Sequence, residues 1–210
     1  MVISYHGGEC FKVSFGETTL AFNPISKDSK LKPAKFGSDI VLISLNHQDM
    51  NGADMATFGD RQPFVVSGPG EYEVKEITIK GFASQSHYSG KEGLNTVYFV
   101  TLEGMNLCFL GALGTPDLPQ EAKQELDDVD ILFVPVGGEG VLDASAAYKL
   151  AVKLEPHIIV PMHYGEVGGK DALKQFLKQA GAEGTKPEEK LTLKKKDLEG
   201  KEAEVVVLSS

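Results

Sequence analysis

The order of short apolar runs along this chain of 210 residues constrains its fold more than any other feature. In the first half, short runs rich in apolar and β-branched residues follow one another, and Gly or Pro separates several of them. This pattern predicts strands at residues 2–5, 10–15, 18–23, 40–45, 64–67, 77–82, 96–101 and 106–110.

The second half alternates helix-like segments with fully apolar runs. Helices are predicted at residues 119–126, 144–154 and 170–180, the second of them capped by Asp143. Strands are predicted at residues 130–136, 158–161, 190–193 and 203–208. The chain thus begins with a series of predicted strands, and helices are inserted between the later strands. This order indicates two sheets with helices outside them. No low-complexity linker divides the chain, so we expect a single domain over residues 1–210.

Composition excludes several classes of partner. The formal net charge is −9 and Arg61 is the single arginine, which argues against a nucleic-acid surface. No apolar run approaches the ~18 residues of a membrane-spanning helix. The N-terminal residues lack the features of a secretory signal, so we expect a cytoplasmic protein that binds neither nucleic acid nor membrane. The oligomeric state stays open.

Both cysteines, Cys10 and Cys108, precede Phe within apolar stretches. Such neighbours favour buried, reduced thiols, although the spacing alone leaves a disulfide between them open.

Polar side chains follow several of the apolar runs at the point where each run ends. His47 and Asp49 follow the run 40–45, His163 follows the run 158–161, and His87 follows the run that starts at residue 77. A single histidine is more often a core or surface residue satisfied by hydrogen bonds than a ligand. Three at strand ends, one of them close to an aspartate, favour a shared site with the ligand chemistry of a metal.

These segments are where the chain resembles the metallo-β-lactamase superfamily. It is most similar to the small zinc-dependent hydrolases of the ascorbate-lactonase-like type. The resemblance covers nearly the whole chain, and residues 39–51, 67–74, 95–99, 130–138 and 160–164 carry it. It implies an α/β fold, the four-layer αβ/βα sandwich. In that fold two packed sheets carry helices on their outer faces, and the metal site lies at one edge.

The resemblance also implies which metal ligands survive and which are lost. The family signature His-x-His-x-Asp-His falls on Leu45, His47, Asp49 and Met50, and the metal-bridging aspartate falls on Ala112. Three ligand positions are therefore lost: Leu45, Met50 and Ala112. Two divalent ions ~3.5–4 Å apart need shared negative charge, so we expect no paired site.

Two hypotheses for the function follow. In the first, the chain no longer performs the family's hydrolysis and acts as a binding or structural relative, which holds no metal or one divalent ion and takes a small-molecule ligand. In the second, it is a mononuclear hydrolase of a lactone, ester or phosphoester, with Asp49 as its catalytic group. One divalent ion, zinc by the ligand types, would then be held by His47, Asp49, His87 and His163. Whether the chain is an enzyme depends on this choice.

Overall fold

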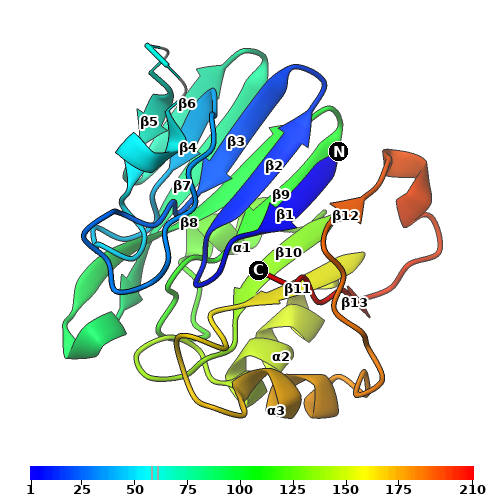
Figure 1. Cartoon of the computed structure of the whole chain (residues 1–210). Coiled ribbons are helices and arrows are strands. Elements are labelled where there is room, and N and C mark those ends of the chain that lie inside the picture. Colours follow the sequence, from blue (N-terminus) through cyan, green and yellow to red (C-terminus); the bar gives the residue numbers. More distant parts are fainter. Residues whose placement is uncertain (58, 61) are drawn as a thin grey trace.

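Two β-sheets packed face to face form the body of the protein (Figure 1). The computed structural model describes residues 1–57, 59–60 and 62–210, so Arg61 lies outside the described residues. The six-stranded sheet has the order β12-β1-β2-β3-β4-β5. Its strands are Leu191–Thr192, Val2–Tyr5, Phe11–Phe15, Thr18–Phe22, Ile40–Leu42 and Phe64–Val66.

The seven-stranded sheet has the order β13-β11-β10-β9-β8-β7-β6. Strands β6 to β9 run antiparallel to one another, whereas β9, β10, β11 and β13 run parallel. The strands, from β6 onward, are Gly70–Val74, Ile77–Ser86, Gly93–Leu102, Met105–Phe109, Ile131–Pro135, Ile158–Met162 and Glu204–Val205.

The hydrophobic core lies between the two sheets, and its centre is aromatic. Phe11 packs against Phe133 with ring centroids 4.8 Å apart, and Phe22 packs against Phe109 at the same distance. All four side chains are fully buried. Because these rings come from strands in both sheets, their removal from water holds the sheets together.

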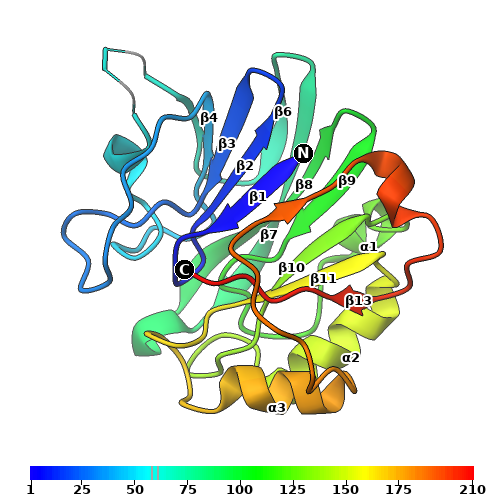
Figure 2. The ribbon, with the colours of Figure 1, turned by 45° about the vertical axis from the view of Figure 1, so that its right-hand side comes forward.

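The outer faces of the two sheets are covered differently (Figure 2). On the seven-stranded sheet lie α1 (Gln120–Glu125), α2 (Ala144–Leu154) and α3 (Ala172–Gln179). A second apolar cluster joins them to the sheet. Ala21 and Val41 on the six-stranded sheet, and Ile43 directly after β4, are covered by the short 3-10 helix η1 (Ala53–Ala56) and by Phe36. The predicted helices outside the sheets are thus confirmed. On the outer face of the six-stranded sheet, the covering layer consists of one helical turn and a loop.

Local patterns predicted most of these elements. Helix α2 has the predicted bounds, and Asp143 caps it by accepting a hydrogen bond from the backbone N–H of Ala146 at 2.8 Å.

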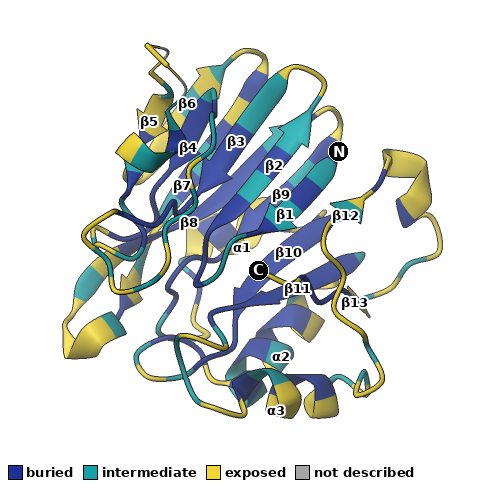
Figure 3. Cartoon of the chain, in the orientation of Figure 1, coloured by how far each residue is buried: buried dark blue, intermediate teal, exposed yellow. Residues whose placement is uncertain are grey.

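Cys10 and Cys108 are buried and free, which confirms reduced core thiols. A further 3-10 helix, η3, spans Lys195–Leu198. Figure 3 shows how the central strands are buried while the loops at the rim are exposed. No helix within the described ranges is long and apolar enough to cross a membrane.

Candidate functional site

The segment that follows β4 is fixed by hydrogen bonds from both sheets. The backbone N–H of Thr96, in β8, donates to the carbonyl oxygen of Ser44 at 2.8 Å. The Asn23 side chain accepts from the backbone N–H of Ser44 at 2.7 Å and donates to its hydroxyl at 2.8 Å. These bonds hold the start of the loop in place, so the position of His47 and Asp49 is set by the sheets.

The carboxylate of Asp49 has hydrogen-bond partners on both oxygens. Oδ1 accepts from the hydroxyl of Ser29, and Oδ2 accepts from the hydroxyl of Tyr88 at 2.6 Å. The imidazole Nδ1 of His47 accepts from the backbone N–H of Asp49 at 3.3 Å and lies 3.5 Å from Asp49 Oδ2. Asp49 therefore joins the loop after β4 to two other segments of the chain.

His163 forms a buried pair with a carboxylate. Its Nδ1 lies 2.8 Å from Glu9 Oε1, and the side chains are 1% and 0% exposed. The other oxygen of Glu9 accepts from the Asn23 amide at 2.9 Å. The backbone N–H of His163 donates to the carbonyl of Gly8, which brings the end of β11 against the turn between β1 and β2. The second ring nitrogen of His163, Nε2, is buried and has no hydrogen-bond partner among the described residues.

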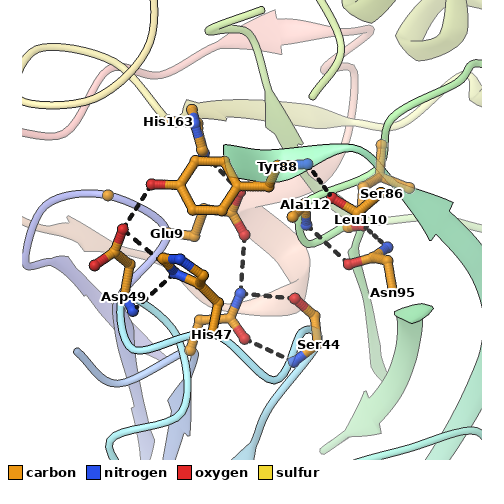
Figure 4. Close-up of polar contacts among 12 residues, drawn as sticks. Glu9, Ser44, His47, Asp49, Ser86, Tyr88, Asn95, Leu110, Ala112 and His163 are labelled. Atoms are coloured by element: carbon orange, nitrogen blue, oxygen red, sulfur yellow. Dashed lines mark hydrogen bonds and ion pairs between the residues drawn. The ribbon is translucent and has the colours of Figure 1, made fainter. Parts of the chain in front are cut away.

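The ring of Tyr88 lies between two histidines (Figure 4). It packs nearly perpendicular to His47, with centroids 4.9 Å apart, and to His163 at 5.1 Å. Tyr88 begins the 3-10 helix η2 (Tyr88–Gly90), which follows β7, and its backbone N–H donates to the hydroxyl of Ser86. Burial, and then the hydrogen bond to Asp49, raise the pKa of the Tyr88 phenol well above its ordinary value. The phenol thus remains a hydrogen-bond donor at neutral pH.

An apolar cluster occupies the remaining ligand positions. Leu45, Met50 and Ala112 are buried against one another and Val141, and Tyr88 packs on them. These three are the positions where the resemblance implies lost ligands. A cluster of this composition excludes water and offers an ion no oxygen or nitrogen ligand.

A polar clamp holds the turn that carries Ala112. The Asn95 side chain accepts from the backbone N–H of Ala112 at 2.9 Å and donates to the carbonyl of Leu110. Gly111 has a φ of +58°, and a Cβ there would lie 2.4 Å from the Ser44 hydroxyl. Only glycine therefore fits this turn, which keeps the methyl group of Ala112 inside the cluster.

His87 has a different environment from the other three predicted ligands. Its side chain is 45% exposed, and its Nε2 lies 3.8 Å from Glu92 Oε1. Its backbone N–H donates to the carbonyl of Gly140 at 3.0 Å. The contacts of the structure thus join His47, Asp49 and His163 through Tyr88, and they direct the ring of His87 toward Glu92.

The side chains in this arrangement do not fit a metal ion. Within the described ranges, no group of three or more His, Cys, Asp or Glu residues is placed so that it could hold one. Asp49 is engaged by two hydroxyl groups, and the ring of Tyr88 lies between the imidazoles of His47 and His163. The candidate site is therefore a hydrogen-bonded and apolar cluster.

Sequence reasoning missed three residues of this cluster: Glu9, Ser29 and Tyr88. Glu9 gave a usable signal, because a carboxylate directly before the apolar run 10–15 must be either exposed or paired. Tyr88 and Ser29 gave none, since no periodicity relates a tyrosine after β7 or a serine in an unpatterned loop to Asp49.

Two mixed sheets with helices outside them, and a histidine- and aspartate-bearing edge at the strand ends, define the class of the protein as a metallo-β-lactamase-type sandwich. A family model for the beta-lactamase superfamily domain matches residues 2–163. The chain therefore belongs to the β-lactamase superfamily.

Relatives and solved structures agree with this assignment. A UPF0173 metal-dependent hydrolase of Listeria innocua is 28% identical over 197 residues, covering 78% of this chain and 85% of that protein. One from Thermoplasma acidophilum is 26% identical over 187 residues, covering 77% and 82%. A crystal structure from Thermotoga maritima, assigned as a Zn-dependent hydrolase of the metallo-β-lactamase superfamily, has a TM-score of 0.74 at 27% identity. It covers 99% of this chain and 97% of that one. These relatives are thus named as metal-dependent hydrolases.

Proposed function

We propose that this protein is a metal-free member of its superfamily that has lost the metal-dependent hydrolysis and serves as a binding or structural relative. The observation that carries the proposal is the apolar cluster at the ligand positions, in which Leu45, Met50 and Ala112 pack with Val141 and Tyr88. An ion there would have to displace apolar side chains and would gain none of the oxygen and nitrogen ligands that compensate for its lost hydration.

The polar residues of the site support the same proposal. Asp49 and Glu9 are the carboxylates of the cluster, and each has partners on both oxygens. A carboxylate that acts as a general base must reach a substrate or a water molecule. Because the oxygens of both carboxylates already have hydrogen-bond partners within the protein, a structural role is favoured for Asp49 and Glu9.

The proposed ligand is a small molecule, and the proposed compartment is the cytoplasm. A cavity of about 600 Å³ beside α2 is lined largely by apolar atoms, including those of Pro116, Ala146, Tyr148 and Val152. This volume lies in the range of small-molecule pockets. Two free cysteines suit a reducing compartment.

The alternative function is a mononuclear metal-dependent hydrolase of a lactone, ester or phosphoester. The names of the relatives favour it. It requires His47, Asp49, His87 and His163 to converge on one zinc ion, with Asp49 as the catalytic group. That convergence would need the Tyr88 ring to leave and the exposed side chain of His87 to turn inward.

Metal analysis combined with an activity assay tests the proposal. The purified protein is treated with EDTA, dialysed, and titrated calorimetrically with zinc and manganese; hydrolysis of p-nitrophenyl acetate and bis(p-nitrophenyl) phosphate is followed with and without metal. We expect metal far below one ion per chain, and the same hydrolysis as in a His47→Ala variant. Stoichiometric zinc, together with hydrolysis that both EDTA and His47→Ala abolish, would establish the mononuclear hydrolase instead.

A further inference from the structure

The side of α2 that faces away from the sheet carries a large aliphatic residue. The buried side of this helix consists of Ala144, Ala147, Leu150 and Ala151. At about 100° per residue, Val152 falls outside this buried side, and it is 49% exposed. A helix whose apolar side is already packed usually presents polar residues to solvent, so the surroundings of Val152 are a candidate binding surface.

The cavity of about 600 Å³ beside α2 lies at this surface. Val152 lines it together with Tyr148 of the same helix and Pro116 of the loop after β9. The ring of Tyr148 is held from α3 by Phe176, with centroids 6.5 Å apart and the rings nearly perpendicular. None of the lining residues belongs to the apolar cluster around Tyr88, so the cavity is a site of its own.

Two lysines line the same cavity, and neither has an ion-pair partner among the described residues. Lys149 and Lys153 stand four positions apart on α2, which places them on neighbouring turns of one side of the helix. Other lysines form close ion pairs with carboxylates: Lys75, Lys80, Lys195 and Lys201.

The charges around the cavity differ between its two ends. Asp143 also lines it, but this carboxylate caps the start of α2 and accepts from the backbone N–H of Ala146 at 2.8 Å. The two lysines lie in the second half of the helix. In a chain of net charge −9, a pair of cations without carboxylate partners beside an apolar lining complements a ligand with an anionic head and an apolar body.

We infer that the cavity beside α2 binds a small amphipathic carboxylate, a ligand with the chemistry of a free fatty acid. The carboxylate lies against Lys149 and Lys153, and the alkyl chain lies along Val152 and Tyr148. Burial of the alkyl chain provides the affinity, and the two ammonium groups select the charge of the head group. The inference rests on the small-molecule ligand of the proposed function, and it names the class of that ligand.

Three ligands with the same alkyl chain test the class. Decanoate, decyltrimethylammonium and decanol differ in the charge of the head group, and each is titrated calorimetrically below the concentration at which it self-associates. We expect one decanoate per chain, and affinity for decyltrimethylammonium at least about tenfold weaker. Equal affinity for the anion and the cation, or no saturable binding of decanoate, would overturn the inference.

Matched substitutions locate the site. Replacing both Lys149 and Lys153 by Gln should weaken decanoate binding about tenfold and leave decanol binding unchanged. The control replaces Lys174 and Lys178 by Gln, because these exposed lysines of α3 are also four positions apart and line no part of the cavity. An equal loss of decanoate affinity in both double variants would show unspecific attraction and overturn the site.

The apolar half of the site has its own variant. Val152→Ser should weaken decanoate and decanol alike, since both bury the same alkyl chain. Unchanged affinity for both ligands would overturn the placement of the chain along α2. Thermal melts of every variant confirm that it is folded.

The outcomes separate this inference from the proposed function. Stoichiometric zinc together with metal-dependent hydrolysis overturns the metal-free function, whereas decanoate binding that requires Lys149 and Lys153 still supports the site on α2. If the chain takes up neither zinc nor decanoate, the metal-free function stands and the inference falls. Binding of the chain to phosphatidylglycerol vesicles without binding of monomeric decanoate would assign this surface to a membrane and overturn the small-molecule ligand.

Discussion

Glu9 Oε1 lies 2.8 Å from His163 Nδ1, and the two buried residues stand 154 positions apart in the sequence. The pair joins the turn between β1 and β2 to the end of β11, and Asn23 connects it to the loop that leads to His47. This buried polar network thus ties both sheets together at the edge that carries the candidate site (Figure 4).

Removing one partner of this pair should be costly. We expect Glu9→Ala to lower the free energy of unfolding by about 3–5 kcal/mol, because it leaves the imidazole of His163 and the amide of Asn23 unpaired in the interior. Urea unfolding of the variant measures the loss. The exposed Glu73, on strand β6, supplies the control, and Glu73→Ala should stay within about 0.5 kcal/mol of the natural chain. Equal effects of the two substitutions would contradict a structural role for the Glu9–His163 pair.

Folding of the natural chain should be independent of metal. The clusters between the sheets and beneath the helices are extensive, so apolar burial sets the fold without an ion. EDTA should therefore leave the thermal midpoint unchanged, whereas a fall of many degrees would reveal a structural metal.

Restoring the lost ligands should reverse this independence. Leu45→His, Met50→His and Ala112→Asp together place two imidazoles and a carboxylate inside an apolar cluster. Without metal, the triple variant should be less stable than the natural chain by several kcal/mol, since buried polar and charged groups lack partners. Zinc should recover part of the loss. Thermal melts with and without zinc measure both the loss and its recovery, and a triple variant whose thermal midpoint does not respond to zinc would show that the scaffold no longer supports the site.

The stability of the protein should depend on pH through His6. Its imidazole stacks on Phe36 at 5.0 Å, and burial, followed by the charge of Lys12, lowers the pKa of His6. Below its unfolded value of about 6.5, the unfolded chain binds the proton more readily than the folded chain. Stability should therefore fall as the pH drops below about 6.5 and toward the folded pKa.

A His6→Phe variant isolates this contribution, since Phe keeps the ring contact with Phe36 and cannot titrate. We expect the variant to lose less stability than the natural chain between about pH 7.5 and 5 in urea unfolding. Identical slopes in the two proteins would show that His6 has the same proton affinity in both states.

Both thiols should be unreactive in the folded protein. Burial raises the pKa of Cys10 to about 12 and raises that of Cys108 as well, so at pH 8 almost no thiolate is present to react. Ellman's reagent should report no fast thiol in the native state and two after denaturation. A rapid native reaction would place one cysteine in an accessible environment.

The sequence by itself predicted most of the elements and most of their bounds to within about one residue, although strand β6 and the 3-10 helices were not predicted. Apolar alternation and caps are local signals, so strand β1 and helix α2 with its Asp143 cap lie where the pattern predicts them. Strand β7 extends to Ser86, four residues beyond the predicted end, because its pairing with β8 continues into polar residues that no apolar pattern marks.

The sequence also indicated the ends of strands at which functional side chains gather. It predicted His47 and Asp49 after β4 and His163 after β11, and the structure brings these three residues into contact with one tyrosine. The resemblance gave Leu45, Met50 and Ala112 as lost ligands, and they share one apolar cluster. A single zinc site that includes His87 stays a prediction, which the zinc titrations address.

Only the tertiary structure decided what occupies the site. The contact of Tyr88 with Asp49 spans 39 positions, and that of Glu9 with His163 spans 154. No periodicity relates residues at such separations, because their distance depends on the packing of the two sheets and on the course of the loops between them. The resemblance predicts which ligand positions are lost, whereas the packing determines which side chains lie at that edge, here Tyr88 against the apolar cluster.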